Sequence, residues 1–206
     1  MADDAQENSG SEADKRLARA MYLIDEENGR DPNLVQVEGR AWPAELLYAT
    51  RLSDWLQRLA PDASEALRLA ARSQHICRWM IPRESYEATK GGYLKWRNDL
   101  KTFHARKTGE ILTTVGYPPE FIRKVQELNL KKNFPNDPES RVLEDALCLV
   151  FLEFQFGELA ARTSDEKMIN ALQKSWRKMT EQGRAFALQL PFGAKEKALL
   201  EAALAM

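Results

Sequence analysis

The chain holds two histidines, and each lies in an apolar helical pattern where an imidazole could do chemistry. His75 occurs in LRLAARSQHICRW and His104 in KTFHARKTGEIL, while Asp145 follows in LEDALCLVFLE. Helical bundles build metal sites from imidazole and carboxylate groups that point inward from separate helices. We therefore expect His75, His104 and Asp145 to converge closely enough to share an ion or a water, with Glu45 or Gln74 nearby.

The expected convergence follows from the cost of burying polar groups. Each of the three side chains is flanked by Leu, Ile, Ala or Phe, and each would cost roughly 1–3 kcal/mol if it were buried without a partner. A divalent metal (Mn, Fe, Zn or Mg) is the cofactor that such a set predicts, with His75, His104 and Asp145 as its ligands.

Each of these residues also has a structural interpretation. His75 can be a hydrogen-bonded histidine of the core, and His104 can be a surface residue on a helix rich in lysine and arginine. Glu144 and Asp145, close to a helix start, can simply favour the helix dipole. Glu45 can equally be an exposed residue that belongs to no site.

A second set of residues surrounds the first and combines aromatic rings with cationic groups. Such groups suit a planar or anionic ligand, and the substrate-binding candidates are Arg78, Arg83, Tyr93, Trp96, Arg97 and Lys101. We expect Trp79, Tyr93, Trp96 and Arg97 to line the same cavity as His75. The alternative is that the tryptophans and tyrosines, at helical spacing, belong to the core.

The elements that must position these residues are all helical. Apolar residues recur with a 3.6-residue period from Glu12 onward, and no stretch alternates with period two over a useful length. The pattern predicts an all-α fold, with a disordered acidic tail at 1–11 and a single domain at 12–206. The expected helices span 12–28, 43–60, 62–80, 93–115, 119–131, 138–160, a segment from 165, and 194–206.

Composition excludes several classes of protein. With a net charge of −1 and a pI near 6.2, the chain has no cationic excess for duplex nucleic acid. No apolar run is long enough for a membrane span, and the two cysteines lie far apart without a CxxC motif. A cytoplasmic protein is expected. The sequence also has no Gly-rich phosphate loop, nucleophile elbow or HExxH motif.

The order of four segments resembles the HD-domain superfamily of metal-dependent phosphohydrolases. The segments are YATRLS from Tyr48, LAARSQHIC from Leu69, His104 followed by GEIL, and LEDAL from Leu143. The resemblance implies an orthogonal helical bundle with its core at about 43–160, and it places Asp145 on the metal.

Two departures from the HD pattern fall on the metal ligands themselves. Tyr48 stands where the first histidine of that family would be, and Gln74-His75 stands where its His-Asp pair would be. The usual metal set is therefore not intact. Glu45 lies one turn before Tyr48 on the same helix face and could replace the missing histidine. Tyr48, Gln74 and Glu144 are expected near the site.

A longer succession of segments resembles an uncharacterised domain-of-unknown-function family. These segments are ENGRDPN, AELLYATRLSDWLQRLAPDASEALRLAARSQHICRW, IPR, GYLKWR and FHA. Members of that family are often automatically labelled glutamyl-tRNA synthetase. The label does not suit this chain, because a class I synthetase needs a nucleotide-binding α/β core and the pattern here predicts no strands.

Two functions of different classes follow. The first is an HD-like metal-dependent hydrolase acting on a small phosphorylated or anionic substrate, in which the metal lowers the pKa of a bound water. Arg83, Arg97 or Lys101 would take the phosphate charge. The second is a non-catalytic, HD-derived binding module with an anion and aromatic pocket and a degenerate metal site. In both, the expected partner is a small anionic ligand or nucleotide.

Overall fold

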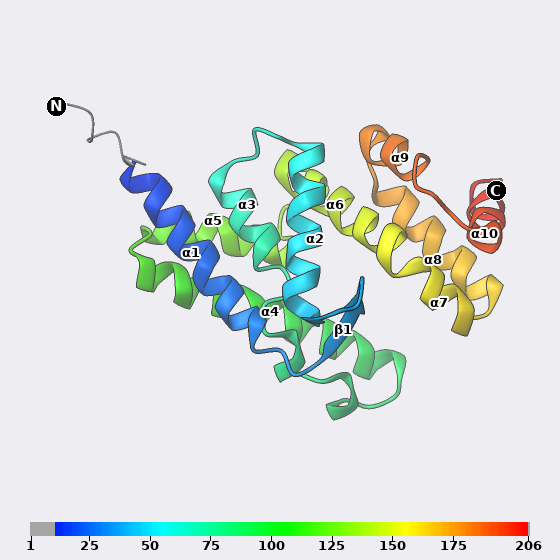
Figure 1. The fold of residues 1–206 in the computed structure, drawn as a ribbon, viewed down its shortest axis with the longest axis horizontal. Coiled ribbons are helices and arrows are strands. Elements are labelled where there is room, and N and C mark those ends of the chain that lie inside the picture. The colour runs from blue at the N-terminus through cyan, green and yellow to red at the C-terminus, as the bar shows by residue number, and fades with distance from the viewer. Residues whose placement is uncertain (1–10, 206) are drawn as a thin grey trace.

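The computed structural model describes residues 11–205, and helices dominate it (Figure 1). The prediction of a mainly helical chain is confirmed, and the HD type of bundle stays a prediction. Residues 1–10 of the predicted tail and the terminal Met206 lie outside the described residues. The α-helices are α1 (Glu12–Gly29), α2 (Ala44–Leu59), α3 (Glu65–Arg72), α4 (Lys90–Val115), α5 (Pro119–Leu130), α6 (Pro138–Phe154), α7 (Phe156–Arg162), α8 (Asp165–Lys178), α9 (Glu181–Ala187) and α10 (Ala194–Leu204).

The helices are arranged along one long axis, with α1 and α10 at opposite ends of the molecule (Figure 1). Helix α2 stands at the centre, where it packs on α6, α3 and α1. Helix α4, the longest, packs on α5 and α1, and α8 packs on α10. Helices α2, α4 and α6 therefore form the central scaffold, on which helices from both ends of the molecule pack.

Helix starts follow the expected capping chemistry. Ser11 caps α1 with a capping box, in which its hydroxyl accepts from the Asp14 N–H and the Asp14 carboxylate accepts in return. The start of α3 differs from the prediction, because Ser64 caps it in place of Asp62. Helix α6 begins after Asp137, whose carboxylate accepts from the Ser140 N–H at 2.7 Å.

The helix predicted at 62–80 is wrong over its second half. Helix α3 ends at Arg72, a turn follows, and only the short 3₁₀ helix η1 (Arg78–Met80) continues it. Cys77 has a left-handed backbone (φ 53°), and its N–H donates to Asn28 Oδ1 at 3.2 Å. The Asn28 side chain of α1 thus holds Cys77 in a left-handed conformation that an α-helix does not contain. His75 lies on the same turn.

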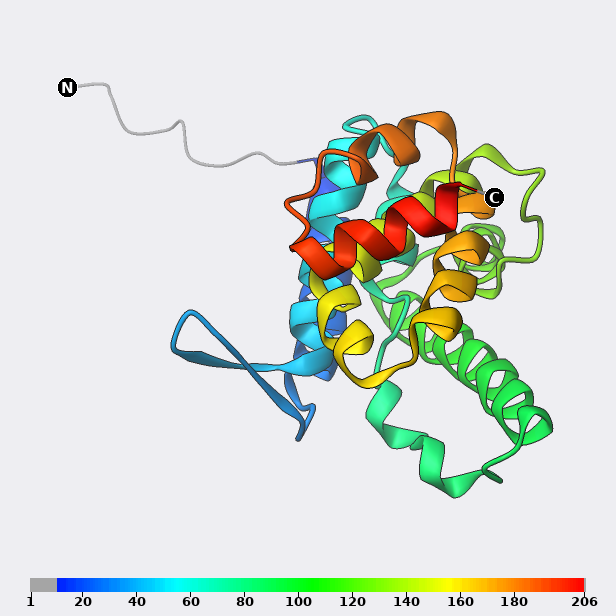
Figure 2. The ribbon, with the colours of Figure 1, turned by 90° about the vertical axis from the view of Figure 1, so that its right-hand side faces the viewer.

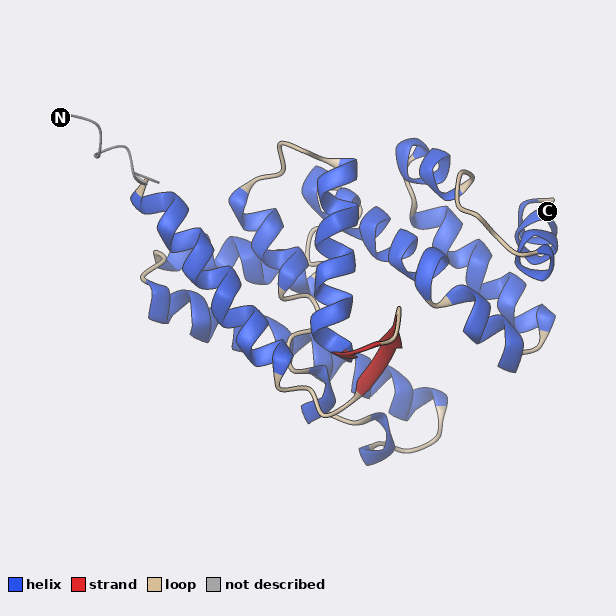
Figure 3. Ribbon diagram, viewed as in Figure 1, coloured by secondary structure: helices blue, strands red, loops and turns tan. Residues whose placement is uncertain are grey.

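A short β-hairpin follows α1, although no sheet beyond a stray pair of residues was expected. Strands β1 (Leu34–Val37) and β2 (Arg40–Pro43) pair antiparallel (Figure 3), and the hairpin projects away from the helices (Figure 2). Glu38 (φ 52°) and Gly39 (φ 76°) form the connection with two left-handed residues, as a tight hairpin turn requires. Four-residue strands are too short for their alternation to stand out from the surrounding pattern.

Three other boundaries differ from the prediction. The expected helix at 138–160 is interrupted at Gln155 (φ −125°), which separates α6 from α7. Helix α4 begins at Lys90, three residues early, because the Thr89 hydroxyl accepts from the Gly92 N–H. Helix α9, capped by Thr180, was not predicted. A second 3₁₀ helix, η2 (Arg83–Ser85), lies in the loop before α4.

Most of the buried hydrophobic side chains form one connected cluster that includes residues of α1 and α10. Trp55 of α2 is among its largest members and is 1% exposed. Its indole N–H donates to Glu153 Oε2 at 2.7 Å, and its ring meets Phe186 edge to face. None of the described helices is long and apolar enough to cross a bilayer.

We expect Trp55→Ala to lower the free energy of unfolding by about 3–5 kcal/mol, because it removes a large side chain and leaves a cavity. Urea titration followed by circular dichroism measures the change. Tyr22→Ala is the control, since Tyr22 is 52% exposed, and its effect should stay within about 0.5 kcal/mol. A Trp55→Ala variant as stable as wild type would show that this side chain does not organise the core.

Candidate functional site

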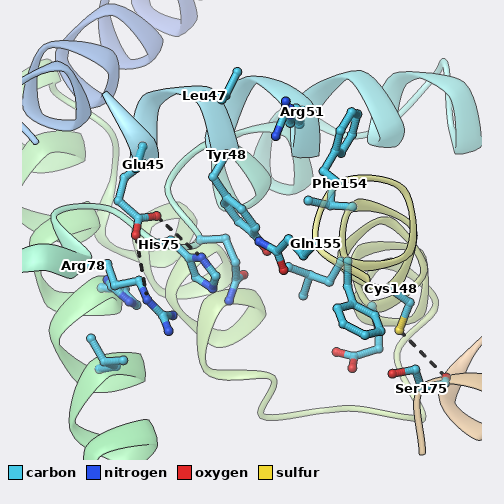
Figure 4. Close-up of a pocket in the computed structure, with 18 of the residues that line it drawn as sticks. Glu45, Leu47, Tyr48, Arg51, His75, Arg78, Cys148, Phe154, Gln155 and Ser175 are labelled. Atoms are coloured by element: carbon cyan, nitrogen blue, oxygen red, sulfur yellow. Dashed lines mark hydrogen bonds and ion pairs between the residues drawn. The ribbon is translucent and has the colours of Figure 1, made fainter. Parts of the chain in front are cut away.

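A cavity of about 500 Å³ opens between α2, α4, α6 and the turn after α3 (Figure 4). This volume is in the usual range for small-molecule sites. Ionisable and polar side chains make up most of its lining. They are Glu45, Tyr48, Arg51, Gln74, His75, Arg78, Arg97, Lys101, His104, Lys131, Glu144, Gln155, Glu158, Ser175 and Lys178.

The first turns of α2 present one edge of this cavity. Glu45, Tyr48 and Arg51 recur every third residue and so share a helix face that turns toward the cavity (Figure 4). Asp31 fixes where this helix begins, because its Oδ2 accepts from the Glu45 N–H at 3.0 Å while its Oδ1 accepts from the Asn33 N–H. The hairpin base therefore sets the position of Glu45.

His75 reaches the cavity from the turn after α3 and lies between two groups of α2. The Tyr48 ring stacks on the imidazole with centroids 4.2 Å apart and an interplanar angle of 15°. His75 Nδ1 lies 3.7 Å from Glu45 Oε2 (Figure 4). Burial and then the nearby Arg78 hold the pKa of His75 well below its usual value. The imidazole is therefore neutral near pH 7.

His104 lies on α4, and one of its ring nitrogens is committed to the backbone. Its Nδ1 lies 2.8 Å from the carbonyl oxygen of Ile76, on the same turn as His75. A carbonyl can only accept, so Nδ1 carries the proton and donates. Burial lowers the pKa of His104 to about 4, although the bond to Ile76 opposes the shift. The two histidine ring centroids are 5.8 Å apart.

Glu45 is the carboxyl group of the cavity that lies beside His75. Burial raises the pKa of its carboxyl to about 7, with Asp31 adding to the rise and Arg78 opposing it. Arg78 Nε lies 3.8 Å from Glu45 Oε1, and its guanidinium also covers the Trp96 ring. The carboxyl therefore changes its charge close to neutral pH.

Cationic side chains dominate the other side of the cavity. Lys131 and Lys178 both contact the buried Glu144 carboxylate, Lys178 at 3.0 Å. Within residues 11–205, Arg97 and Lys101 form no ion pair with a carboxylate. Burial, and then Lys131 and Arg97, lower the pKa of Lys101. The neighbouring positive charges thus add to the effect of burial on Lys101.

The structure brings together most of the residues proposed from the sequence. Nine of them line this one cavity. Two come from α2, and the others come from the turn after α3, η1, α4 and α6. The nine residues are Glu45, Tyr48, Gln74, His75, Arg78, Arg97, Lys101, His104 and Glu144.

Asp145 is not one of them, which corrects the expected convergence with the two histidines. One of its oxygens accepts from the Thr180 N–H at 2.8 Å and the other from the Thr180 hydroxyl. Thr180 in turn caps α9, since its hydroxyl accepts from the Gly183 N–H. The Asp145 carboxylate therefore holds the start of α9 and does not line the cavity.

Four aromatic and cationic candidates also lie outside the cavity lining, although they were expected to contact the ligand. Arg83 donates to the carbonyls of Tyr86 and Glu87, so it holds the loop before α4. The Trp96 indole donates to the Ile81 carbonyl at 2.9 Å. The other two are Trp79, which packs on the core, and Tyr93, which is 43% exposed.

Three cations of the cavity were missed in the sequence. Arg51 follows Tyr48 by three residues, so helical spacing alone could have indicated it. Its guanidinium lies over the Phe154 ring at 3.9 Å. Lys131 ends α5 and Lys178 ends α8, and no sequence spacing connects them with α2.

These residues do not fit the divalent metal that the HD resemblance implies. Within the described chain, no three His, Cys, Asp or Glu side chains lie close enough together to hold one ion. Asp145 is occupied by Thr180, and Glu144 is neutralised by two lysines. His104 can offer only its Nε2, because Nδ1 donates to Ile76.

Comparison with known proteins places the chain by its sequence. A family model described as Domain of unknown function (DUF4202) matches residues 18–200, which is most of the chain. No curated protein and no solved structure matches it.

The raised pKa of Glu45 gives a pH dependence with a defined sign. The folded chain holds this proton more tightly than the unfolded chain, so the stabilising effect is complete below pH 4.5 and is lost as the pH rises to about 7. We expect wild type to lose about 3 kcal/mol relative to Glu45→Gln between pH 4 and 8.

Urea unfolding of both proteins across this pH range measures the difference. The exposed Glu110→Gln is the control, and it should track wild type. Parallel stability curves for wild type and Glu45→Gln would contradict the assignment of a raised pKa to Glu45.

The capping role of Asp145 predicts a loss of stability. We expect Asp145→Ala to lower the free energy of unfolding by about 1–2 kcal/mol, because Thr180 loses both acceptors, and Asp145→Asn to cost less. Urea unfolding measures both values. A Tm that rises with added Mn²⁺ in wild type but not in Asp145→Asn would contradict this role and support a metal ligand.

Proposed function

This chain belongs to the family described as Domain of unknown function (DUF4202), and from the geometry of its cavity we propose that it binds a small phosphorylated anion. The contacts would come from Arg78, Arg97 and Lys101, joined by the lysines at the ends of α5 and α8. This is the binding-module alternative, with a small anionic ligand or a nucleotide as partner.

The observation that carries the proposal is the unbalanced charge of the cavity. Six cationic side chains and three carboxyl groups line it. Burial raises the pKa of one of those carboxyls, Glu45, to about 7, and another, Glu144, is shared by two lysines. Crowding cations around a partly buried cavity costs free energy, and a bound anion removes that cost.

The kinds of cation present favour phosphate over a simple carboxylate. Guanidinium groups present forked donors that match phosphate oxygens, and lysines supply additional charge. Arg97 and Lys101 lie four residues apart on α4, so they share a helix face and can hold one group between them. Arg78 approaches from η1, on another side of the cavity.

We favour anion binding over metal-dependent hydrolysis because the side chains that would have to hold the metal ion do not suit it. The hydrolase proposal needs a divalent ion on His75, His104, Asp145 or Glu45, and Asp145 is committed to Thr180. A divalent cation would also meet the repulsion of the surrounding arginines and lysines. An anion meets attraction from the same groups.

We expect Lys101→Gln and Arg97→Gln each to weaken phosphate binding by about 10–100-fold, the effect of losing one charged hydrogen-bond donor. Isothermal titration with inorganic phosphate and with propyl phosphate at constant ionic strength measures the affinity. Arg106→Gln is the matched control, because it removes one positive charge from an exposed position on the same helix. Its affinity should equal that of wild type.

Two results would contradict the proposal. Wild type that binds neither phosphate probe has no such site. An affinity that falls equally in Lys101→Gln and Arg106→Gln would indicate general attraction to the charge of the protein, with no contribution from the cavity.

A further inference from the structure

Two side chains that line the cavity also carry buried acceptors without a partner, and from them we infer that the ligand is a hydroxyl-bearing phosphate ester, of the polyol or sugar phosphate class. The two acceptors are Nε2 of His104 and Oε1 of Gln74. The inference rests on the proposed function, because it assigns the second half of a ligand whose phosphate the cations hold.

His104 has a fixed polarity. Its Nδ1 donates to the Ile76 carbonyl at 2.8 Å, so the proton of the neutral ring is on Nδ1. Nε2 is left with a lone pair and can only accept. The residue is 3% exposed, and this nitrogen has no hydrogen-bond partner within the described chain. A buried acceptor without a donor is costly, so the site is complete only when a donor arrives.

Gln74 supplies the second acceptor from the turn after α3. It is 5% exposed and lines the same cavity as His104. Its Oε1 is buried, and no donor contacts it within the described residues. The turn that carries Gln74 is the one that His104 fastens through Ile76, so the two acceptors belong to one local structure.

The surrounding charge determines which donor fits. An ammonium group would have to enter beside Arg78, Arg97 and Lys101, where the pKa of Lys101 is already lowered. Burial, and then Arg78 and more weakly Lys131 and Arg97, lower the pKa of His75. A neutral hydroxyl donates a hydrogen bond without adding positive charge, so it suits the acceptors where an amine does not.

The spacing along α4 relates the hydroxyl to the phosphate. Lys101 and His104 are three residues apart and both line the cavity, about one helical turn or 5 Å along the axis. Arg97 extends the cationic stripe by one further turn in the other direction. A short carbon chain that carries a phosphate at one end and a hydroxyl near the other spans this stripe.

A matched pair of ligands tests the inference. Glycerol 3-phosphate and propyl phosphate share three carbons and a phosphate, and they differ by two hydroxyl groups. We expect wild type to bind glycerol 3-phosphate at least about tenfold more tightly in isothermal titration. The preference should fall to about twofold or less in His104→Asn and in Gln74→Met, with the affinity for propyl phosphate unchanged.

The two variants are chosen so that the fold is kept. The amide of His104→Asn can still donate to the Ile76 carbonyl, while the Nε2 acceptor is lost, and Gln74→Met keeps the length of the side chain without its oxygen.

The outcomes separate the two proposals. Equal affinities for both ligands in wild type would overturn the hydroxyl assignment and leave the phosphate site standing. If the preference for glycerol 3-phosphate survives in both variants, the hydroxyl binds elsewhere. If both variants lose affinity for the two ligands equally, the two residues serve the phosphate or the fold. Either result overturns the inference. Absence of binding by any phosphate compound would instead overturn the proposed function.

Discussion

The hydrogen bond from His104 Nδ1 to the Ile76 carbonyl is the contact on which the cavity depends. The chain leaves its helix at Arg72, and the following turn has backbone groups without helical partners. His104 on α4 satisfies one of them, and Asn28 on α1 accepts from the Cys77 N–H. These two long-range bonds replace the local bonds that a continued helix would make. As a result, the segment with Gln74 and His75 faces the cavity as a turn, held from two sides.

His104 adds no charge to the cavity. Burial lowers the pKa of His104 to about 4, although the bond from Nδ1 to the Ile76 carbonyl opposes the shift, so the imidazole is neutral near pH 7. The positive potential therefore comes from arginines and lysines alone, and it does not vanish near neutral pH as a histidine charge would. The group that titrates near neutrality is Glu45, whose negative charge increases as the pH rises to about 7. Neutral acceptors and permanent cations thus lie side by side, which suits a ligand that is anionic at one end and polar at the other.

Much of the fold could be predicted from periodicity and capping, because both act within a few residues. Helix α5 and the start of α1 fell close to their predicted bounds for this reason. The break after Arg72 could not be predicted, since Asn28 and His104 lie 49 and 28 residues from the groups they bind. Asp145 shows a second limit. The sequence pattern around a carboxylate in an apolar helix is the same whether that carboxylate binds a metal or, as here, caps α9 through Thr180. Only the tertiary contact distinguishes the two roles.

The two departures from the HD pattern, at Tyr48 and Gln74, both lie in the lining of the cavity. Tyr48 stands in place of a metal-binding histidine, and its ring stacks flat on His75. Burial raises the pKa of the Tyr48 phenol, which keeps it protonated and a poor metal ligand. Gln74 offers a neutral amide in place of an imidazole. Both changes remove ligands that stabilise a divalent cation, while the cations of α4, α5 and α8 remain. A cavity with fewer metal donors and undiminished positive charge disfavours a metal and favours an anion by the same Coulomb energy.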